Sequence, residues 1–254
     1  MARKKFNRIN EVKYNNFGSK MEIIACRGYD DIDVYFEEYN WTFYHNKYDH
    51  FKNGSIRCPY EPRFFGIGYI GEGKYVMKKD KLTNAWTGML RRCYDEKSRI
   101  KNPTYIDCTV CKEWHNFQNF AKWYEENYYE IEGQCMQLDK DILIKGNKIY
   151  SPQTCIFVPQ RINDLFVKKD VNRGELPIGV TIEQHRYKTS YRVSCQGSNN
   201  KQIYIGCFDT PHYAFLVYKL NKELVIQSIA KEYKNVIPQK LYESLINYQV
   251  EIND

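Results

Sequence analysis

Apolar positions repeat at helical spacing in two stretches of the middle of the chain. Residues 82–95 carry apolar side chains three and four positions apart, which places them on one face of an α-helix. A second helix is expected from about Trp114 to Tyr128, and Tyr105–Cys111 between the two is expected to be extended. The two apolar faces are formed by Trp86, Met89, Leu90, Cys93 and Tyr94, and by Phe117, Phe120, Ala121 and Tyr124.

The first 65 residues favour β-structure. Lys20–Cys26 and Ile32–Phe36 are short, partly alternating runs that glycine and aspartate residues separate. Phe51–Arg57 predicts a turn and one more short strand, so a unit of about four strands is expected. The glycine-rich stretch Gly66–Gly73 lacks the Gly-Lys-Ser/Thr of a phosphate-binding loop, and it is therefore predicted to be a connector.

A strand, strand, helix order is predicted farther along the chain. Met136–Leu143 and Lys148–Tyr150 are expected to form a hairpin around a turn at Gly146–Asn147. The apolar run Cys155–Val158 leads into a short helix, from about Pro159 to Phe166, with proline at an early helical position.

The C-terminal part predicts a sheet followed by a long helix. A polar segment at residues 168–175 is the best candidate for a linker. A helix-start signal at Asp209–Pro211 opens a long helix that runs to about Lys234. Pro238 ends it, and a short helix to about Leu245 follows. Between linker and helix lie three strand-like segments, Gly179–Glu183, Ser190–Cys195 and Gln202–Gly206.

These elements predict an α+β protein with three domains. Residues 1–65 would be the small β-unit, which we interpret as an accessory surface for DNA or another partner. Residues 66–168 would hold a ββα core with flanking helices. Residues 169–254 would hold a three-stranded antiparallel sheet, the long helix and the C-terminal helix.

Alternation along the three C-terminal strands gives this sheet one apolar and one polar face. The apolar face would pack on the long helix. The polar face fits either an ordinary half-solvated sheet or a surface that enters the major groove of DNA. The predicted apolar side consists of Val180, Ile182, Val193, Cys195, Ile203 and Ile205, and the polar side of Thr181, Glu183, Arg192, Ser194, Gln202 and Tyr204.

Gly179–Val180, Tyr191–Val193, Ile205–Thr210 and a helix with Ala214 and Tyr218 resemble the AP2 DNA-binding domain. The resemblance covers about residues 176–225, with Tyr191 where the family usually has tryptophan. Members of this family place the sheet in the major groove. The resemblance therefore implies contacts with double-stranded DNA by Arg186, Lys188, Arg192, Gln202 and Tyr204.

The segment of residues 82–166 resembles the ββα-metal core of HNH endonucleases, in the version found in bacteriophage and intron-associated homing endonucleases. The residues that carry the resemblance are Trp86, Arg92–Tyr94, Val110–Trp114, Phe117, Phe120, Leu138–Asp139, Tyr150–Pro152, Cys155 and Asn163. Phage proteins of this kind often join such a core to a C-terminal AP2-like domain.

The HNH resemblance implies a catalytic site with Asp139, Lys140, Asp141 and Asn163. Asp139, Asp141 and Asn163 would hold Mg²⁺, which polarises the scissile phosphate. Lys140, however, stands where the family has the histidine that activates water, and Thr154 replaces a usual asparagine. Lysine is a poor base near neutral pH. The lost histidine favours an inactive or very slow core, whose acidic residues are remnants used for packing or for DNA backbone contact.

Composition narrows the classes of protein without deciding between these hypotheses. The net charge is +7, which is compatible with a phosphate-facing surface as well as with a lysine-rich solvated one. No secretory signal or membrane span is predicted, so a cytoplasmic protein is expected. The HNH resemblance implies that it is encoded by a phage and acts in a bacterial host cell. The nine cysteines fit reduced thiols. Structural zinc at Cys108, Cys111, His115 and Cys135 is disfavoured, because a second close cysteine pair is missing.

Three functional hypotheses follow. The first is a phage-type DNA-binding protein related to HNH homing endonucleases, with the sheet as its DNA-binding surface. The second is an active, metal-dependent, site-specific endonuclease or nickase. The third is a phage counter-defence protein, similar in role to anti-CRISPR inhibitors, that binds a host nuclease or its guide RNA. The sequence specifies neither the target site nor the oligomeric state.

Overall fold

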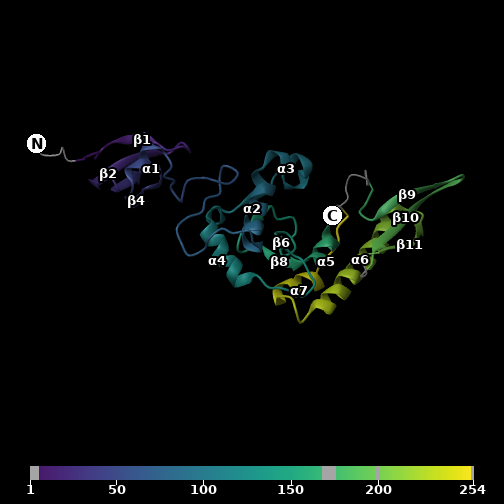
Figure 1. Ribbon diagram of the computed structural model, residues 1–254. Helices are drawn as coiled ribbons and strands as arrows, with labels where there is room; N and C mark the ends of the chain where they lie inside the picture. Colours follow the sequence, from purple (N-terminus) through teal and green to yellow (C-terminus); the bar gives the residue numbers. More distant parts are fainter. Residues whose placement is uncertain (1–5, 168–175, 198–200, 253–254) are drawn as a thin grey trace, which may run out of the picture. The chain divides into compact units, whose positions relative to one another are not determined.

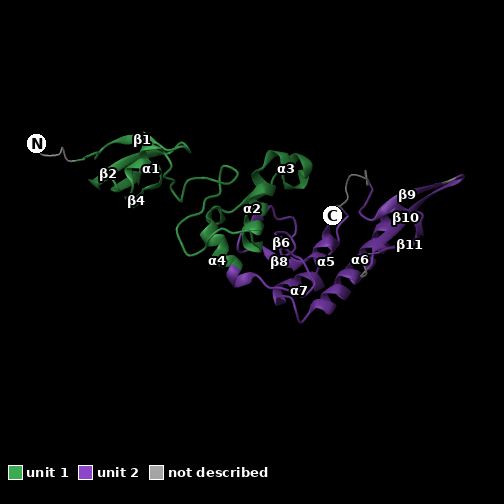
Figure 2. Cartoon of the chain, in the orientation of Figure 1, with its two compact units in different colours: residues 1–124 green, residues 125–254 purple. Residues whose placement is uncertain are grey.

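The computed structural model of the chain describes residues 6–167, 176–197 and 201–252 (Figure 1). The chain is a mixed α+β protein that divides into two compact units, residues 1–124 and 125–254 (Figure 2). The predicted linker at residues 168–175 lies outside the described residues, and the predicted domain boundaries stay predictions.

The N-terminal sheet of the first unit is an antiparallel meander in the order β1-β2-β3-β4. Its inner side is apolar and packs on helix α1, Tyr48–Lys52, where Phe51 is fully buried. The predicted number of about four strands in this unit is confirmed. The strands are β1 Val12–Tyr14, β2 Lys20–Gly28, β3 Asp31–Phe36 and β4 Trp41–Asn46, with a short 3-10 helix at Glu37–Tyr39.

The strand predicted within Phe51–Arg57 is wrong. The fourth strand is β4 instead, and the chain turns after α1 at Gly54, whose φ is +68°. Asn16 holds this turn, because its amide N–H donates to the Gly54 carbonyl and its side chain donates to the Asn53 carbonyl. These carbonyls are therefore satisfied by a loop and not by a neighbouring strand.

Helices α2 (Lys81–Tyr94) and α4 (Phe117–Asn127) confirm the two amphipathic helices predicted in the middle of the chain. The Asp80 side chain caps α2 by accepting a hydrogen bond from the Thr83 amide at 2.8 Å. The short elements between them are α3 Glu96–Lys101, 3-10 helices at Pro103–Tyr105 and Lys112–His115, and β5 Thr109–Val110. The predicted apolar residues are buried, apart from the partly exposed Tyr94 and Tyr124.

The glycine-rich stretch before α2 is a connector, as predicted, and it is closely packed. A Cβ on Gly68 would lie 2.5 Å from Cδ1 of Leu90 and 3.1 Å from the Trp86 ring. A Cβ on Gly71 would meet the side chain of Asn116 at 2.2 Å. These glycines serve close backbone packing, which a larger residue would prevent.

The second unit begins with strand β6, Met136–Asp139, which pairs antiparallel with β8, Ile156–Pro159. The predicted hairpin between Met136–Leu143 and Lys148–Tyr150 is therefore wrong. The extended conformation ends at Asp139, because its carboxylate accepts the amides of the next turn. The fully buried β8 supplies the apolar partner strand. The remaining elements here are β7 Ile149–Tyr150, α5 Gln160–Asn163 and a 3-10 helix at Asp164–Phe166.

The C-terminal sheet has the order β11-β10-β9, and all pairs are antiparallel. Its strands are β9 Val180–His185, β10 Lys188–Gln196 and β11 Gln202–Phe208, which confirms the predicted three-stranded sheet. The long helix α6, Pro211–Tyr233, packs against one side of this sheet, mainly on β10 (Figure 1). Helix α7, Gln239–Ile246, follows.

Helix α6 contributes to two apolar cores within the second unit. Its first half packs Ala214 and Phe215 against the sheet. Its second half packs Ile226 and Ile229 with β8, α5 and α7. The helix has little amphipathic character because it buries different sides along its length. None of the described helices is both long and apolar enough to cross a membrane.

Candidate nucleic-acid interface and candidate metal centre

The register of the C-terminal strands defines a sheet face that α6 does not cover. Val180 and Val193 form one cross-strand pair and are buried toward α6. The neighbouring pair, Thr181 and Arg192, therefore projects to the opposite side. We call this side the outer face. The pairs Ser194–Tyr204 and Gln196–Gln202 also belong to it, after a β-bulge between Val193 and Ser194.

Arg192 and Tyr204 are in contact at the centre of the outer face. The guanidinium carbon of Arg192 lies 4.9 Å from the centroid of the Tyr204 ring, and both side chains are exposed. A guanidinium held over an aromatic ring keeps its N–H donors in a fixed plane. The two residues that the sequence selected on different strands are thus brought together.

Glu183 and Cys207 complete a polar cluster around Tyr204. The Cys207 thiol donates a hydrogen bond to Glu183 Oε2 at 2.8 Å, and the Tyr204 hydroxyl donates to the Cys207 sulfur at 3.5 Å. The hydrogen bond with Cys207 is the main cause of a raised pKa at Tyr204. The phenol is protonated at neutral pH, and its single O–H donates to Cys207 in this arrangement. Cys207 was not selected from the sequence, because simple alternation places it with Ile205 on the apolar side. The β-bulge changes the alternation, and Cys207 lies on the outer face opposite Arg192.

The other predicted DNA-contacting residues lie at the edges of the outer face and are exposed. Lys188 forms an ion pair with Asp209 at 2.6 Å. Arg186 lies over the ring of Tyr187, at 5.4 Å from its centroid, in the turn between β9 and β10. Gln202 lies at the start of β11. Cations are therefore present on β10 and in the turn, and they surround a centre of hydrogen-bonding side chains.

Two residues predicted for the apolar side are not buried. Ile182 is 52% exposed and Ile203 is 51% exposed. They lie on β9 and β11, the two edge strands, whereas α6 packs mainly on the central strand β10. The predicted alternation is correct for the central strand, and the narrow contact with a single helix limits burial at the edges.

Asp139 ends β6 and is held by the backbone of the following turn. Its Oδ1 accepts hydrogen bonds from the amides of Asp141 at 2.9 Å and Ile142 at 2.7 Å. Burial raises the pKa of Asp139 to about 6, and the nearby Asp141 carboxylate adds to the rise. A carboxylate kept in such surroundings is a common feature of functional sites.

Lys140, at the position of the catalytic histidine in the resemblance, is buried and paired. Its ammonium group lies 3.2 Å from Asp141 Oδ2 and 5.9 Å from the centroid of the buried Tyr150 ring. The Asn147 side chain donates to the Lys140 carbonyl at 2.7 Å, which fixes the backbone here. An ammonium group paired with a carboxylate has no lone pair with which to activate water.

These residues do not make a complete site for a divalent cation. Asp139 Oδ1 is already used by two amides, and Asp141 is neutralised by Lys140. Asn163 lies at the end of α5, which packs against β6, and it adds one neutral amide. Mg²⁺ prefers several oxygen ligands with uncompensated negative charge. The donor set therefore does not fit a catalytic metal.

Of the four residues that zinc could use, Cys135 is exposed, whereas Cys108, Cys111 and His115 are buried or half-buried. Cys108 is buried, and burial raises the pKa of the Cys111 thiol. Burial lowers the pKa of His115, whose Nε2 lies 3.1 Å from the Val110 carbonyl oxygen.

The N-terminal sheet holds a charged cluster that was not predicted from the sequence. Ligand atoms of Asp31, Asp33 and His45 lie within 4.8 Å of one another. Arg27 bonds both carboxylates, and its hydrogen bond with Asp31 is the main reason that the pKa of Asp31 falls to about 2. The guanidinium already supplies the positive charge, so this cluster is an ion-pair network. The sequence indicates this cluster only through Asp31 and Asp33, which lie two positions apart and therefore on one side of strand β3.

No family model matches this sequence, and no match is found among curated proteins or solved structures. The AP2 and HNH resemblances therefore rest on the residues of this chain alone.

Proposed function

We propose that this chain binds double-stranded DNA through the outer face of the β9–β10–β11 sheet, without cleaving it. The observation that carries the proposal is the exposed Arg192–Tyr204 pair at the centre of a face that α6 leaves uncovered. A three-stranded sheet with one face packed on a helix can present the other face to the major groove. This arrangement agrees with what the AP2 resemblance implies.

Individual residues of the outer face suit different parts of a duplex. Arg192 offers paired N–H donors, which match the acceptors of guanine in the major groove. Gln202 and Tyr204 offer neutral hydrogen-bonding groups beside it. Arg186 and Lys188, at the turn between strands, suit phosphate oxygens, and a phosphate would replace Asp209 as the partner of Lys188. Glu183 accepts hydrogen bonds, which suits the amino group of cytosine.

Strands β6 and β8 and helix α5 correspond to the ββα core that the HNH resemblance implies, and we propose a structural role for them. Its strand β8 and helix α5 share one apolar core with α6 and α7, so the module supports the helix on which the sheet rests. The paired Lys140 and the incomplete set of metal ligands support a role without catalysis. We also propose that the chain is encoded by a phage and is related to HNH homing endonucleases.

The test is a competition experiment with the full chain and a fluorescent DNA duplex, measured by anisotropy at low salt. Duplex DNA should compete better than single-stranded DNA or a structured RNA. Arg192→Gln should weaken duplex binding by about tenfold, as expected for the loss of a bidentate contact. Lys231→Gln is the matched control, because it removes one exposed charge from the last turn of α6. A preference for RNA, or equal effects of both substitutions, would contradict the proposal.

A further inference from the structure

Lys222 is a buried lysine in the middle of α6. Only 8% of its surface is exposed. Among the residues that the structure describes, no carboxylate or other acceptor is bonded to its amine. Lys219, by contrast, lies nearly one turn earlier and pairs with Glu223 at 2.7 Å and with the Val250 carbonyl at 2.7 Å. Most of this side chain is therefore withdrawn from solvent, and the amine is left able to bond a ligand that enters beside it.

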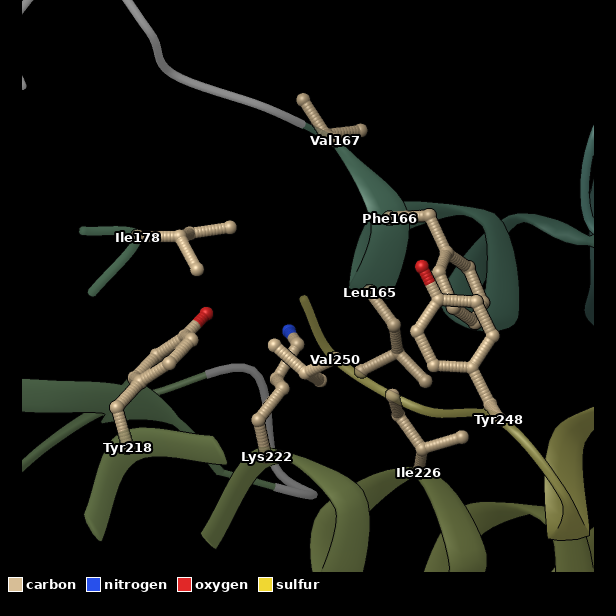
Figure 3. Close-up of a pocket in the computed structure, with 9 residues that line it drawn as sticks. All are labelled: Leu165, Phe166, Val167, Ile178, Tyr218, Lys222, Ile226, Tyr248 and Val250. Carbon is tan, nitrogen blue, oxygen red and sulfur yellow. The ribbon is translucent and has the colours of Figure 1, made fainter. Parts of the chain in front are cut away.

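The side chain of Lys222 extends into a recess of the second unit. Figure 3 shows Lys222 and Tyr218 extending from α6 in the same direction, with the Lys222 nitrogen among apolar side chains. The recess is partly open to solvent, and its empty space, with the open part included, is about 380 Å³. Its other lining residues are Leu165, Phe166, Val167, Ile178, Ile226, Tyr248 and Val250.

The recess lies where the two cores of this unit meet along α6. Leu165 and Ile226 belong to the core shared with β8 and α7. Tyr218 and Val250 belong to the core beneath the sheet. A molecule held here would contact both cores at once, whereas the outer face of the sheet lies on the other side of the strands.

The electrostatics of the recess favour an anionic occupant. Burial lowers the pKa of Lys222, because apolar surroundings disfavour the ammonium form. The titratable group facing it from β10 is the Cys195 thiol, whose pKa is raised by burial. A carboxylate brought against the amine would supply the missing counter-charge and hydrogen-bond acceptor.

We propose that this recess binds a small organic acid, with its carboxylate on the Lys222 amine and an apolar body against the aliphatic and aromatic walls. The wall residues are apolar apart from the amine and two tyrosine hydroxyls, which suits a single carboxylate. A phosphate group needs several strong donors, and the described lining residues of the recess offer one cation. The proposal stands apart from DNA binding, because no outer-face residue lines the recess.

The experiment uses the full chain and two probes, benzoate and hexanoate, with benzyl alcohol as the neutral counterpart. Binding is measured by saturation-transfer NMR and by the shift of the melting temperature. The carboxylates should bind saturably to the wild type and to Lys231→Met, the exposed control on the same helix. Lys222→Met keeps the length of the side chain and should bind them at least about tenfold more weakly, because the charge pair is lost.

Three results would overturn the proposal: no saturable binding of either carboxylate, equal affinity in Lys222→Met, or equal affinity of benzyl alcohol for the wild type. If Lys222→Met does not fold, the test uses the Lys222 amine of the wild-type protein, observed by NMR. Its side-chain ¹⁵N resonance should shift on addition of benzoate and not on addition of benzyl alcohol. An unchanged resonance with benzoate would equally overturn the proposal.

Discussion

Gly179 packs directly against the ring of Tyr218. A Cβ atom on Gly179 would lie 2.1 Å from Cδ2 of Tyr218, and the φ angle of Gly179 is +76°. The glycine precedes β9, and the buried tyrosine lies on α6. Both the backbone conformation and the close approach require glycine at this position. The contact therefore sets how near strand β9 comes to helix α6.

Gly179→Ala should therefore destabilise the second unit by about 3 kcal/mol. The loss combines the strain of a left-handed backbone at alanine with overpacking against Tyr218. Chemical denaturation followed by circular dichroism measures it. Gly146→Ala is the control, because Gly146 has φ +78° and nothing within 4 Å of an added Cβ. It should cost only about 1–2 kcal/mol. Equal losses at both positions would show that the contact with Tyr218 has no energetic role.

Asp139→Asn should change how stability depends on pH. The pKa of Asp139 is raised from 3.8 to about 6 in the folded chain. The folded state therefore holds this proton more tightly than the unfolded state, and its stabilising effect is lost as pH rises from about 4 through 6. The stability of Asp139→Asn relative to wild type should increase by about 2–3 kcal/mol over that interval. Urea denaturation at several pH values provides the measurement.

Asp141→Asn tests the cause of the raised pKa at Asp139. The Asp141 carboxylate contributes to the rise through charge repulsion. Its removal should move the pH-dependent loss of stability to lower pH without abolishing it. Parallel stability profiles for wild type, Asp139→Asn and Asp141→Asn would contradict the electrostatic description of this turn.

The wild-type chain should not nick supercoiled plasmid with Mg²⁺ or Mn²⁺. The reason is the pairing of Lys140 with Asp141 and the two amides on Asp139. Agarose-gel electrophoresis of relaxed and linear products measures nicking. Asp139→Ala serves as the control for contaminating nucleases. Metal-dependent nicking by wild type that is absent from Asp139→Ala would show that the chain is an endonuclease.

The sequence predicted those elements whose signals are local. The amphipathic spacing from Trp86 to Cys93 is sufficient for α2. The Thr210–Pro211 start predicted α6, and the Thr210 hydroxyl indeed accepts the Tyr213 amide at 3.2 Å. The alternation in β10 correctly assigned Val193 inward and Arg192 outward. These patterns depend on neighbours a few residues away.

Features set by distant parts of the chain could not be predicted in this way. The pairing of β6 with β8 depends on which apolar strand is buried beside it, and the short β7 was the nearer candidate in sequence. The burial of Lys222 arises because α6 passes between two cores. The outer-face contact between Arg192 and Tyr204 depends on a bulge that fixes the register. Tertiary packing decides each of these.

The salt dependence of duplex binding tests the proposed function most directly. The association constant of the full chain is measured by anisotropy over a series of salt concentrations for wild type, Arg192→Gln and Lys231→Gln. The proposal predicts affinity that falls steeply with salt, about tenfold weaker binding by Arg192→Gln at every concentration, and no change for Lys231→Gln. Salt-independent binding, or binding that Arg192→Gln leaves intact, would contradict a DNA-binding role for the outer face.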